Sequence, residues 1–280
     1  MTYMKELQKQ VKPYVDYLNR EEKRTSTVAQ YQRNVQKFLQ WGMDKELTKE
    51  NLICYKKGLM ESCKASSVNT KLAAINSFLK FSGNGDLKVK QLSIQKQAYS
   101  PKERELGKEE YQRLIRTAQG KNNERLALLL QTLCGTGIRV GELAFITVEA
   151  VRAGEAAICM KGKNRRILLP ERLCRVLGRY VEKKGITTGS IFITRTGKPI
   201  DRSNVWKMMR ALCKEAEVEP QKVFPHNLRH LFARSFYAMD KDLAKLADIL
   251  GHSSINTTRI YIISSGTEHR RCIDALGLVG

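Results

Sequence analysis

Apolar residues recur every three or four positions in the first part of the chain, which is the spacing of amphipathic helices. Residues 4–20 carry such a stripe, which includes Leu7, Val11 and Leu18. Three similar stripes follow, each after Ser or Thr residues that favour a helix start, over residues 28–41, 49–59 and 68–82. Four short helices in one continuous stretch predict a compact helical domain.

The helical period breaks at residues 83–104, where glycines, a proline and several lysines replace the apolar stripe. This composition is typical of an extended basic linker. We therefore expect one domain over residues 1–97 and a second over residues 98–280.

The second domain changes its hydrophobic period along its length. Residues 108–117 and the strongly apolar residues 123–133 predict helices, and Gly135 and Gly137 predict a turn after them. A period of two then predicts three short strands, the last two joined as a hairpin, over residues 145–151, 156–160 and 166–170. Later elements are a helix, a short strand with a turn and a second helix, over residues 171–184, 190–200 and 202–217. The predicted fold class is mainly α with a small antiparallel β-sheet, an α+β arrangement.

The segment from Pro225 to Tyr261 concentrates polar side chains that can do chemistry. Pro225 suits the first turn of a helix, so His226 and Arg229, three residues apart, project from one side of it. We expect His230, which points elsewhere, to be a structural, hydrogen-bonded histidine.

Two further helices are expected in this segment. The first closes at Gly251, directly before His252, and the second follows Ser253 and Ser254 and carries Tyr261. The same two helices also fit the helix-turn-helix of a transcription regulator. That interpretation does not explain Arg139, Lys161, His226 and Arg229.

Charge points to the partner. The 280-residue chain has 50 Lys and Arg against 28 Asp and Glu, a net charge of +22, and both predicted domains are basic. A polyanion that both domains grip is the natural partner, although a solvated basic surface is the alternative. Candidate contacts to DNA are three lysines of the first domain and two arginines of the hairpin, namely Lys37, Lys71, Lys80, Arg165 and Arg166.

Several classes of protein are disfavoured by the sequence. It has no apolar run of about 18 residues, which a membrane helix needs, and its first residues lack the hydrophobic core of a signal peptide. We expect a cytoplasmic protein that does not bind membranes. The seven cysteines form no CxxC pair, and we expect reduced, mostly buried thiols and no metal site.

Imidazoles, guanidiniums and a phenol together suit attack of a tyrosine on a DNA phosphodiester. A planar guanidinium donates two hydrogen bonds to a phosphate and stays charged. Arg139, between glycine-bounded elements far upstream and with Glu142 at i+3, would supply a second clamp beside Arg229.

Four motifs in the order TGIRVGEL, KGKNRRILLP, PHNLRH and LGHSSINTTRIY closely resemble the boxes of the tyrosine recombinase (phage integrase) family, and the chain is Xer-like in size. The resemblance spans the whole chain and implies a SAM-like, core-binding N-terminal domain followed by a catalytic domain. The last motif, with nine residues from His252 to Tyr261, is highly specific.

The resemblance also implies a role for each motif residue. Tyr261 would be the nucleophile, Arg139 and Arg229 would hold the non-bridging phosphate oxygens, and Glu142 would orient the first arginine. Lys161 would protonate the leaving oxygen, with Lys163 as the alternative because this motif is one residue longer to its proline than the commonest Xer-type version. His226 would act as acid or base, and His252 would hydrogen-bond the phosphate.

The activity implied is that of a site-specific recombinase that forms a 3′-phosphotyrosyl link and a Holliday junction without metal, ATP or other cofactor. It would act as a homotetramer on double-stranded DNA carrying specific sites, in the bacterial cytoplasm at the nucleoid, and the resemblance leaves room for a directionality or accessory factor. Residues 268–276 would form a tail helix that docks on a neighbouring protomer. The alternatives are a type IB topoisomerase-like enzyme and a catalytically silent DNA-binding regulator.

Overall fold

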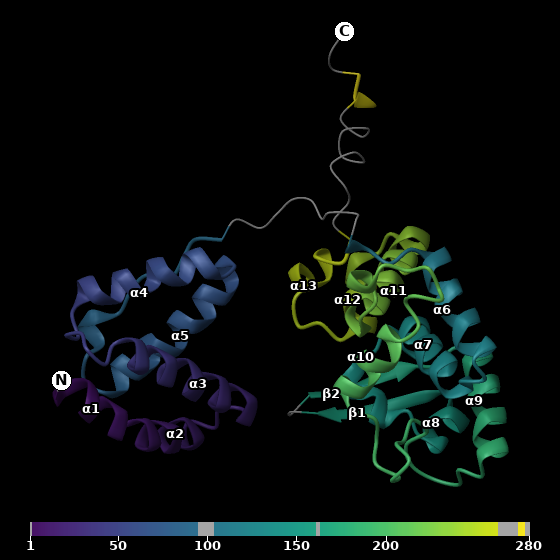
Figure 1. The fold of residues 1–280 in the computed structure, drawn as a ribbon. Coiled ribbons are helices and arrows are strands. Elements are labelled where there is room, and N and C mark those ends of the chain that lie inside the picture. Colours follow the sequence, from purple (N-terminus) through teal and green to yellow (C-terminus); the bar gives the residue numbers. More distant parts are fainter. Residues whose placement is uncertain (1, 95–103, 161–162, 263–273, 278–280) are drawn as a thin grey trace. The chain divides into compact units, whose positions relative to one another are not determined.

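The computed structural model describes residues 2–94, 104–160, 163–262 and 274–277 (Figure 1). The chain divides into two compact units, residues 1–96 and 97–280, each with its own apolar core. A domain boundary after residue 97 remains a prediction, because residues 95–103 lie outside the described residues.

The N-terminal unit is helical, as predicted. The expected first helix is in fact two helices, which end and begin on either side of Gln10. Pro13 has no N–H to donate, so it is tolerated in the first turn of the second helix but not inside one continuous helix. Its elements are α1 (Thr2–Lys9), α2 (Val11–Arg20), α3 (Thr25–Trp41), α4 (Lys49–Ser62), α5 (Ala65–Phe81) and a 3₁₀ turn (Gly85–Leu87).

Aromatic packing closes this unit. Tyr14 of α2 is fully buried and meets Phe78 of α5 edge to face, with ring centroids 5.2 Å apart. Such a pair adds about 0.5–1.5 kcal/mol beyond the apolar area that it buries. Thr48 caps α4 by accepting a hydrogen bond from the amide of Asn51.

The C-terminal unit is built around α7 (Glu124–Thr136), which packs against α6 (Lys108–Gly120), α9 (Glu171–Lys184) and α11 (Pro225–Asp240). In Figure 1, α9 lies on the side of this unit away from α12 and α13. The other elements of the unit are a 3₁₀ helix (Val140–Phe145), α8 (Val148–Ala153), β1 (Glu155–Met160), β2 (Lys163–Leu168), α10 (Arg202–Arg210), a 3₁₀ turn (Pro220–Lys222), α12 (Leu243–Leu250) and α13 (Ile255–Arg259).

The predicted hairpin is confirmed, and the first of the three predicted strands, over residues 145–151, is wrong. β1 and β2 pair antiparallel, with Ile158 opposite Arg165. Residues 145–151 instead end the 3₁₀ helix and begin α8, because the Thr147 side chain accepts a hydrogen bond from the amide of Ala150 and starts a helix there.

Three smaller expectations also need correction. Residues 190–200 form only isolated bridges, and the helix predicted over residues 202–217 ends at Arg210. The expectation of mostly buried thiols is also wrong, because among the six described cysteines, all free thiols, only Cys213 is buried. No helix of the described ranges is long and apolar enough to span a membrane.

Candidate active site

The first motif forms a tight turn at the end of α7. Gly137 ends that helix with φ +63°, and an added Cβ would lie 2.4 Å from the Phe232 ring, so glycine is required for two reasons. The turn places Arg139 at the start of the 3₁₀ helix, where its backbone N–H and Nη1 donate to the two carboxylate oxygens of Glu142 at 2.8 and 3.0 Å. The predicted Arg139–Glu142 pair is confirmed as a contact.

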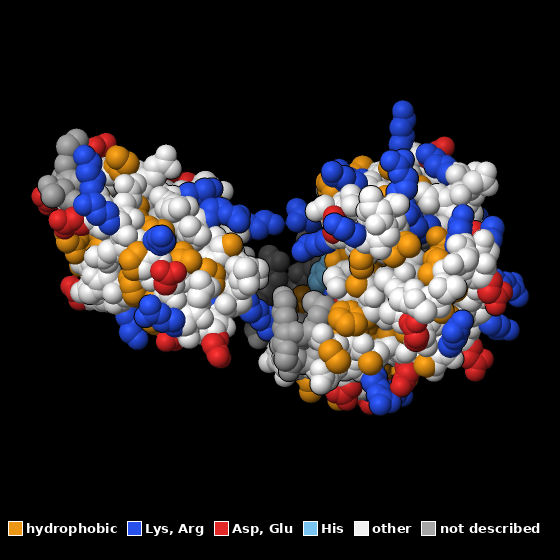
Figure 2. All heavy atoms as spheres, turned by 90° about the horizontal axis from the view of Figure 1, so that it is seen from below, with side chains coloured by type: hydrophobic (Ala, Val, Ile, Leu, Met, Phe, Trp, Pro, Cys, Tyr) orange, Lys and Arg blue, Asp and Glu red, His pale blue; other side chains and the backbone are white. Residues whose placement is uncertain are grey.

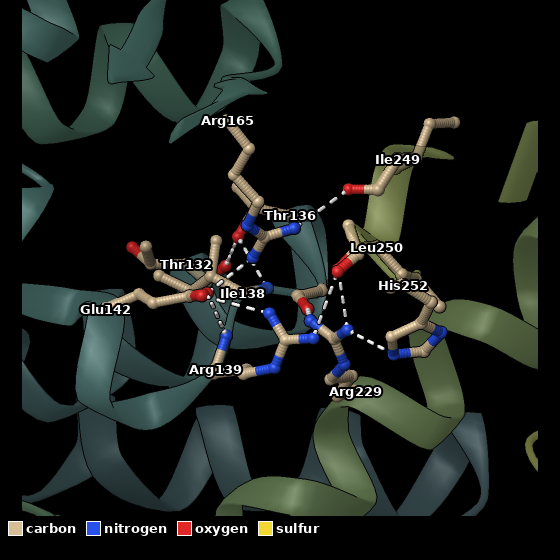
Figure 3. A network of polar contacts seen from close by, with 12 residues as sticks. Thr132, Thr136, Ile138, Arg139, Glu142, Arg165, Arg229, Ile249, Leu250 and His252 are labelled. Carbon is tan, nitrogen blue, oxygen red and sulfur yellow. Dashed lines mark hydrogen bonds and ion pairs between the residues drawn. The ribbon is translucent and has the colours of Figure 1, made fainter. Parts of the chain in front are cut away.

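Glu142 is a buried anion shared by two arginines (Figure 3). Nη2 of Arg165 donates to its Oε2 at 2.5 Å. Burial alone would raise the pKa of Glu142, but the backbone amide of Arg139 and the charge of Arg165 outweigh it and hold the pKa below its usual range. The carboxylate is therefore ionised and balances part of the positive charge around it.

Helix α11 places the third motif, PHNLRH. Pro225 occupies the first turn, and Arg229 lies one turn later, only 1% exposed. Its Nη1 donates to the Gly137 carbonyl at 2.5 Å, and its Nη2 donates to the Leu250 carbonyl at 2.8 Å. Burial lowers the pKa of Arg229 to about 10, and Arg139 adds repulsion, so the group stays charged at neutral pH. Its Nε has no hydrogen-bond partner among the described residues, which leaves a buried donor for an anionic oxygen.

The end of helix α12 gathers three guanidiniums (Figure 3). The consecutive carbonyls of Ile249, Leu250 and Gly251 accept hydrogen bonds. Their donors, in that order, are Arg165, Arg229 and Arg139. The last carbonyls of a helix lack partners within it and carry partial negative charge, which favours cations there. This helix end thus holds together three like charges that would otherwise repel one another.

The His252 ring is fixed by two partners. Nη2 of Arg229 lies 2.7 Å from its Nε2, and Thr258 Oγ1 lies 2.8 Å from its Nδ1. A guanidinium only donates, so Nε2 must accept, and Nδ1 carries the proton and donates to Thr258. Burial lowers the pKa of His252 to about 4, with a further contribution from Arg229, so the ring is neutral at pH 7.

Tyr261 lies in the middle of these groups and is 6% exposed. Its hydroxyl is 3.4 Å from Nε2 of His226, and its ring stacks on His252 with centroids 5.3 Å apart. The Arg229 guanidinium carbon lies 5.9 Å from the centre of the same ring. Burial and the charge of Arg229 lower the pKa of His226 below its usual value, so a neutral imidazole faces the phenol.

The expectation that His230 points elsewhere than His226 was wrong. Its ring lies 4.3 Å from that of Tyr261 and 4.9 Å from that of His226, measured between centroids, so it forms one wall of the tyrosine site. Burial lowers the pKa of His230 to about 3. The spacing of four residues from His226 was the available signal, because such residues share a helix face.

The structure thus brings together Arg139, Glu142, His226, Arg229, His252 and Tyr261. Lys161 lies outside the described residues, and Lys163 begins β2 without a described side chain. Arg166 points away and pairs with Glu155 at 2.9 Å. In the described ranges, no group of three or more His, Cys, Asp or Glu side chains could hold a metal ion.

The three lysines predicted to contact DNA belong to the N-terminal unit. Lys37 and Lys80 are exposed, and Lys71 donates to Cys63 Sγ at 3.0 Å. On the visible face, Lys and Arg side chains are spread over both units (Figure 2).

Chemically, the pocket offers two arginines for an anion and a neutral imidazole beside a buried phenol. Guanidiniums fixed in place can stabilise negative charge that builds up on a phosphate during its transfer. The neutral imidazole can accept the proton that the phenol must lose.

Comparison with known proteins identifies the family of this chain. The phage integrase family model matches residues 104–268, and the model of the phage integrase N-terminal SAM-like domain matches residues 11–83. Tyrosine recombinase XerD of Halalkalibacterium halodurans is 26% identical over 269 residues, covering 88% of this chain and 89% of its own. Tyrosine recombinase XerA of Pyrococcus furiosus is 26% identical over 274 residues, covering 95% and 93%.

Solved structures show the same fold. The crystal structure of XerA recombinase matches with 25% identity and a TM-score of 0.54 over 96% of this chain and 98% of its own. A lambda integrase dimer bound to a COC′ core site matches with 17% identity and a TM-score of 0.73 over 91% and 94%. Because a family model covers more than half of its length, this chain belongs to the phage integrase family and is a tyrosine-type site-specific recombinase.

Proposed function

We propose that the protein exchanges strands between specific double-stranded DNA sites, with Tyr261 as the nucleophile. The observation that carries this proposal is the position of the Tyr261 hydroxyl, 3.4 Å from a neutral His226 and beside the buried Arg229. Nucleophile, base and anion clamp therefore meet within one chain.

In the cleavage step, Tyr261 Oη bonds to the scissile phosphorus, and the bond from phosphorus to the 5′ oxygen breaks. The phenol proton passes to Nε2 of His226, and the leaving oxygen takes a proton from the hairpin lysine, Lys161 or, as the alternative, Lys163. The products are a 3′-phosphotyrosyl link and a free 5′ hydroxyl. Arg139 and Arg229 bind the non-bridging oxygens, and their fixed positive charge stabilises the transition state.

Rejoining reverses these steps with a new partner strand. A 5′ hydroxyl attacks the phosphotyrosine and gives its proton to the hairpin lysine. The bond from phosphorus to Tyr261 Oη breaks, and the proton on His226 returns to the leaving phenolate. One phosphodiester replaces another through a covalent intermediate, so the reaction requires no ATP.

His252 must exchange its hydrogen bond with Arg229 for one with the phosphate. Its Nε2 accepts from Arg229 in this DNA-free state. It can donate to a phosphate oxygen once the ring is protonated, or once the ring switches tautomer and Thr258 donates to Nδ1. A bound phosphate offsets the charge of Arg229 and Arg139, both of which lower the pKa of His252. Phosphate binding and protonation of His252 therefore favour each other.

The N-terminal unit would grip the DNA backbone through Lys37, Lys71 and Lys80, and the hairpin would contribute Arg166. Relatives of the same fold support a homotetramer, since one solved structure is of a lambda integrase tetramer bound to a Holliday junction. We place the enzyme in the bacterial cytoplasm at the nucleoid, with domains over residues 1–97 and 98–280. An accessory or directionality factor is compatible with this scheme.

The test is a denaturing gel of the protein with a nicked, end-labelled duplex that carries its site and traps the cleaved product. The wild type should give a covalent protein–DNA adduct, and Tyr261→Phe should bind the duplex equally well but give none. An adduct in Tyr261→Phe would reject the assigned nucleophile. A two-site assay then separates strand exchange from simple relaxation of supercoils.

A further inference from the structure

Arg165 lies on strand β2, and the sequence groups it with Arg166 as a DNA contact. Its side chain instead reaches the two groups that hold Arg139. We propose that Arg165 is a positioning residue that sets the orientation of the Arg139 guanidinium for phosphate binding. This inference rests on the proposed function, because it assigns Arg165 a part in that same reaction.

The strand alternation turns Arg165 inward. Arg165 pairs with Ile158, and Ile167, two residues later on the same face, is buried opposite Ala156. The Arg165 side chain is 15% exposed, against 75% for Arg166 on the other face of the strand. Sequence neighbours of the same charge thus lie on opposite faces of the hairpin.

The first link to Arg139 runs through Glu142. Arg165 Nη2 bonds Oε2 of this carboxylate at 2.5 Å, and Arg139 Nη1 bonds Oε1 at 3.0 Å (Figure 3). Oε2 also accepts from the backbone N–H of Arg139 at 2.8 Å, so its two donors fill both lone pairs of this oxygen, and Glu142 cannot take the Arg139 side chain in a two-pronged ion pair. Without Arg165, one lone pair of Oε2 is open to the Arg139 fork, and the two-pronged pair is the geometry that carboxylate and guanidinium prefer. That pairing would draw the Arg139 donors from the phosphate.

The second link runs through the end of α12. Nη2 of Arg139 donates to the Gly251 carbonyl at 3.2 Å, and Nη1 of Arg165 donates to the Ile249 carbonyl at the same distance. Gly251 lies directly against Arg165, since an added Cβ would come within 2.5 Å of its Cδ. The Arg165 side chain therefore packs beneath the peptide that holds Arg139.

Only an arginine can make both links at once. Its planar head carries Nη1 and Nη2 in a fixed fork, so one side chain joins the Glu142 carboxylate to the helix end. A lysine keeps the charge but has a single ammonium, which cannot hold both acceptors in this geometry. Arg165→Lys is accordingly a graded variant, and Arg165→Gln removes the charge as well.

The experiment measures single-turnover cleavage of the trapping duplex at saturating protein. We expect Arg165→Gln to slow cleavage by about 10- to 100-fold, as misplacement of a reacting group does, with the Kd for the duplex near the wild-type value. Arg165→Lys should fall between. Arg175→Gln, which removes an exposed arginine of α9, is the matched control and should cleave like wild type.

A double-mutant cycle separates positioning from general loss of structure. If Arg165 acts through Arg139, then in an Arg139→Lys background the Arg165→Gln change should slow cleavage little further. A purely structural role would slow cleavage by the same factor in both backgrounds, and that result overturns the proposal. If Arg165→Gln does not fold, as judged by thermal unfolding, the same cycle is run with Arg165→Lys.

The outcomes also separate this inference from the proposed function. If the wild type gives no adduct on a bound site, the proposed function fails. If the wild type gives an adduct and Arg165→Gln cleaves at the rate of Arg175→Gln, only the role of Arg165 is rejected.

Discussion

The cations of the N-terminal unit and those of the catalytic pocket are held in opposite ways. Lys37 and Lys80 are exposed and extend into solvent from helices whose buried faces are apolar. Arg229 is 1% exposed and bonds two backbone carbonyls and a histidine. A hydrated charge attracts a polyanion from a distance. It stabilises charge on one particular phosphate oxygen only weakly, because water screens the interaction.

A buried guanidinium has the reverse properties. Burying it costs free energy, as the lowered pKa of Arg229 reflects, and the carbonyls at the end of α12 offset part of that cost. In return, its position is fixed and its field is weakly screened, which is what stabilisation of a transition state needs. The exposed lysines Lys37 and Lys80 thus suit DNA binding, and the buried Arg229 suits the chemical step.

Arg229→Lys gives the sharpest test of this difference. A lysine keeps the charge, but its single ammonium cannot hold the carbonyls of Gly137 and Leu250 and also donate to a phosphate oxygen, as Nε of Arg229 is free to do. We expect single-turnover cleavage to fall by about 10²–10³-fold, the loss typical of one fixed transition-state donor, with little change in the Kd for DNA.

Arg139→Lys is the natural comparison, because its side chain is 44% exposed. Its loss in cleavage should be the smaller of the two. Equal losses from both changes, measured on the same trapping duplex, would show that burial does not set the contribution of each arginine.

Local sequence signals predicted the helix ends and turns of this pocket, but they did not predict the contacts that hold its arginines in place. The Pro225 start of α11, the Gly137 turn and the Gly251 helix end were all readable, because each depends on the backbone preference of one residue. The contacts of three arginines with the end of α12 were not readable, since they join residues 21 to 112 positions apart.

The hairpin and the predicted strand at residues 145–151 show the same limit. The alternation of side chains along the strand could have predicted that Arg165 points inward, on the same face as Ile167. The run of basic residues in the motif suggested instead that the tip of the hairpin faces solvent. At residues 145–151 the alternating β-branched residues predicted a strand, and the cap at Thr147 decided for a helix. Side-chain capping outweighed strand propensity over so short a segment.

The buried histidines His230 and His252 should have an effect of intermediate size, on stability at low pH. Burial lowers the pKa of His230 to about 3 and that of His252 to about 4, against about 6.5 for a free histidine. Above pH 7 both are neutral in folded and unfolded chains, and they add no pH dependence. Below pH 6.5 the unfolded chain binds protons that the folded chain does not, so stability falls as pH drops.

At pH 5 each of these histidines should cost about 1–2 kcal/mol of unfolding free energy, after allowance for partial exposure. Thermal unfolding of the DNA-free protein between pH 7 and pH 5 measures the loss. His230→Phe keeps the ring contact with Tyr261 but cannot titrate, so it should remove its share. The same slope in wild type and His230→Phe would mean that His230 is protonated in the folded chain.

The smallest effect belongs to the exposed lysines. We expect Lys37→Ala to weaken DNA binding by severalfold and to lower the slope of log K against log salt by about one, because one phosphate contact is lost. Cleavage within the saturated complex should keep its wild-type rate, since a hydrated lysine acts on binding alone. Titrations at several salt concentrations measure the slope, with Lys9→Ala on α1 as the matched loss of an exposed charge. If Lys37→Ala lowers the cleavage rate at saturation, the N-terminal unit takes part in chemistry, and the division of labour between the two sets of cations fails.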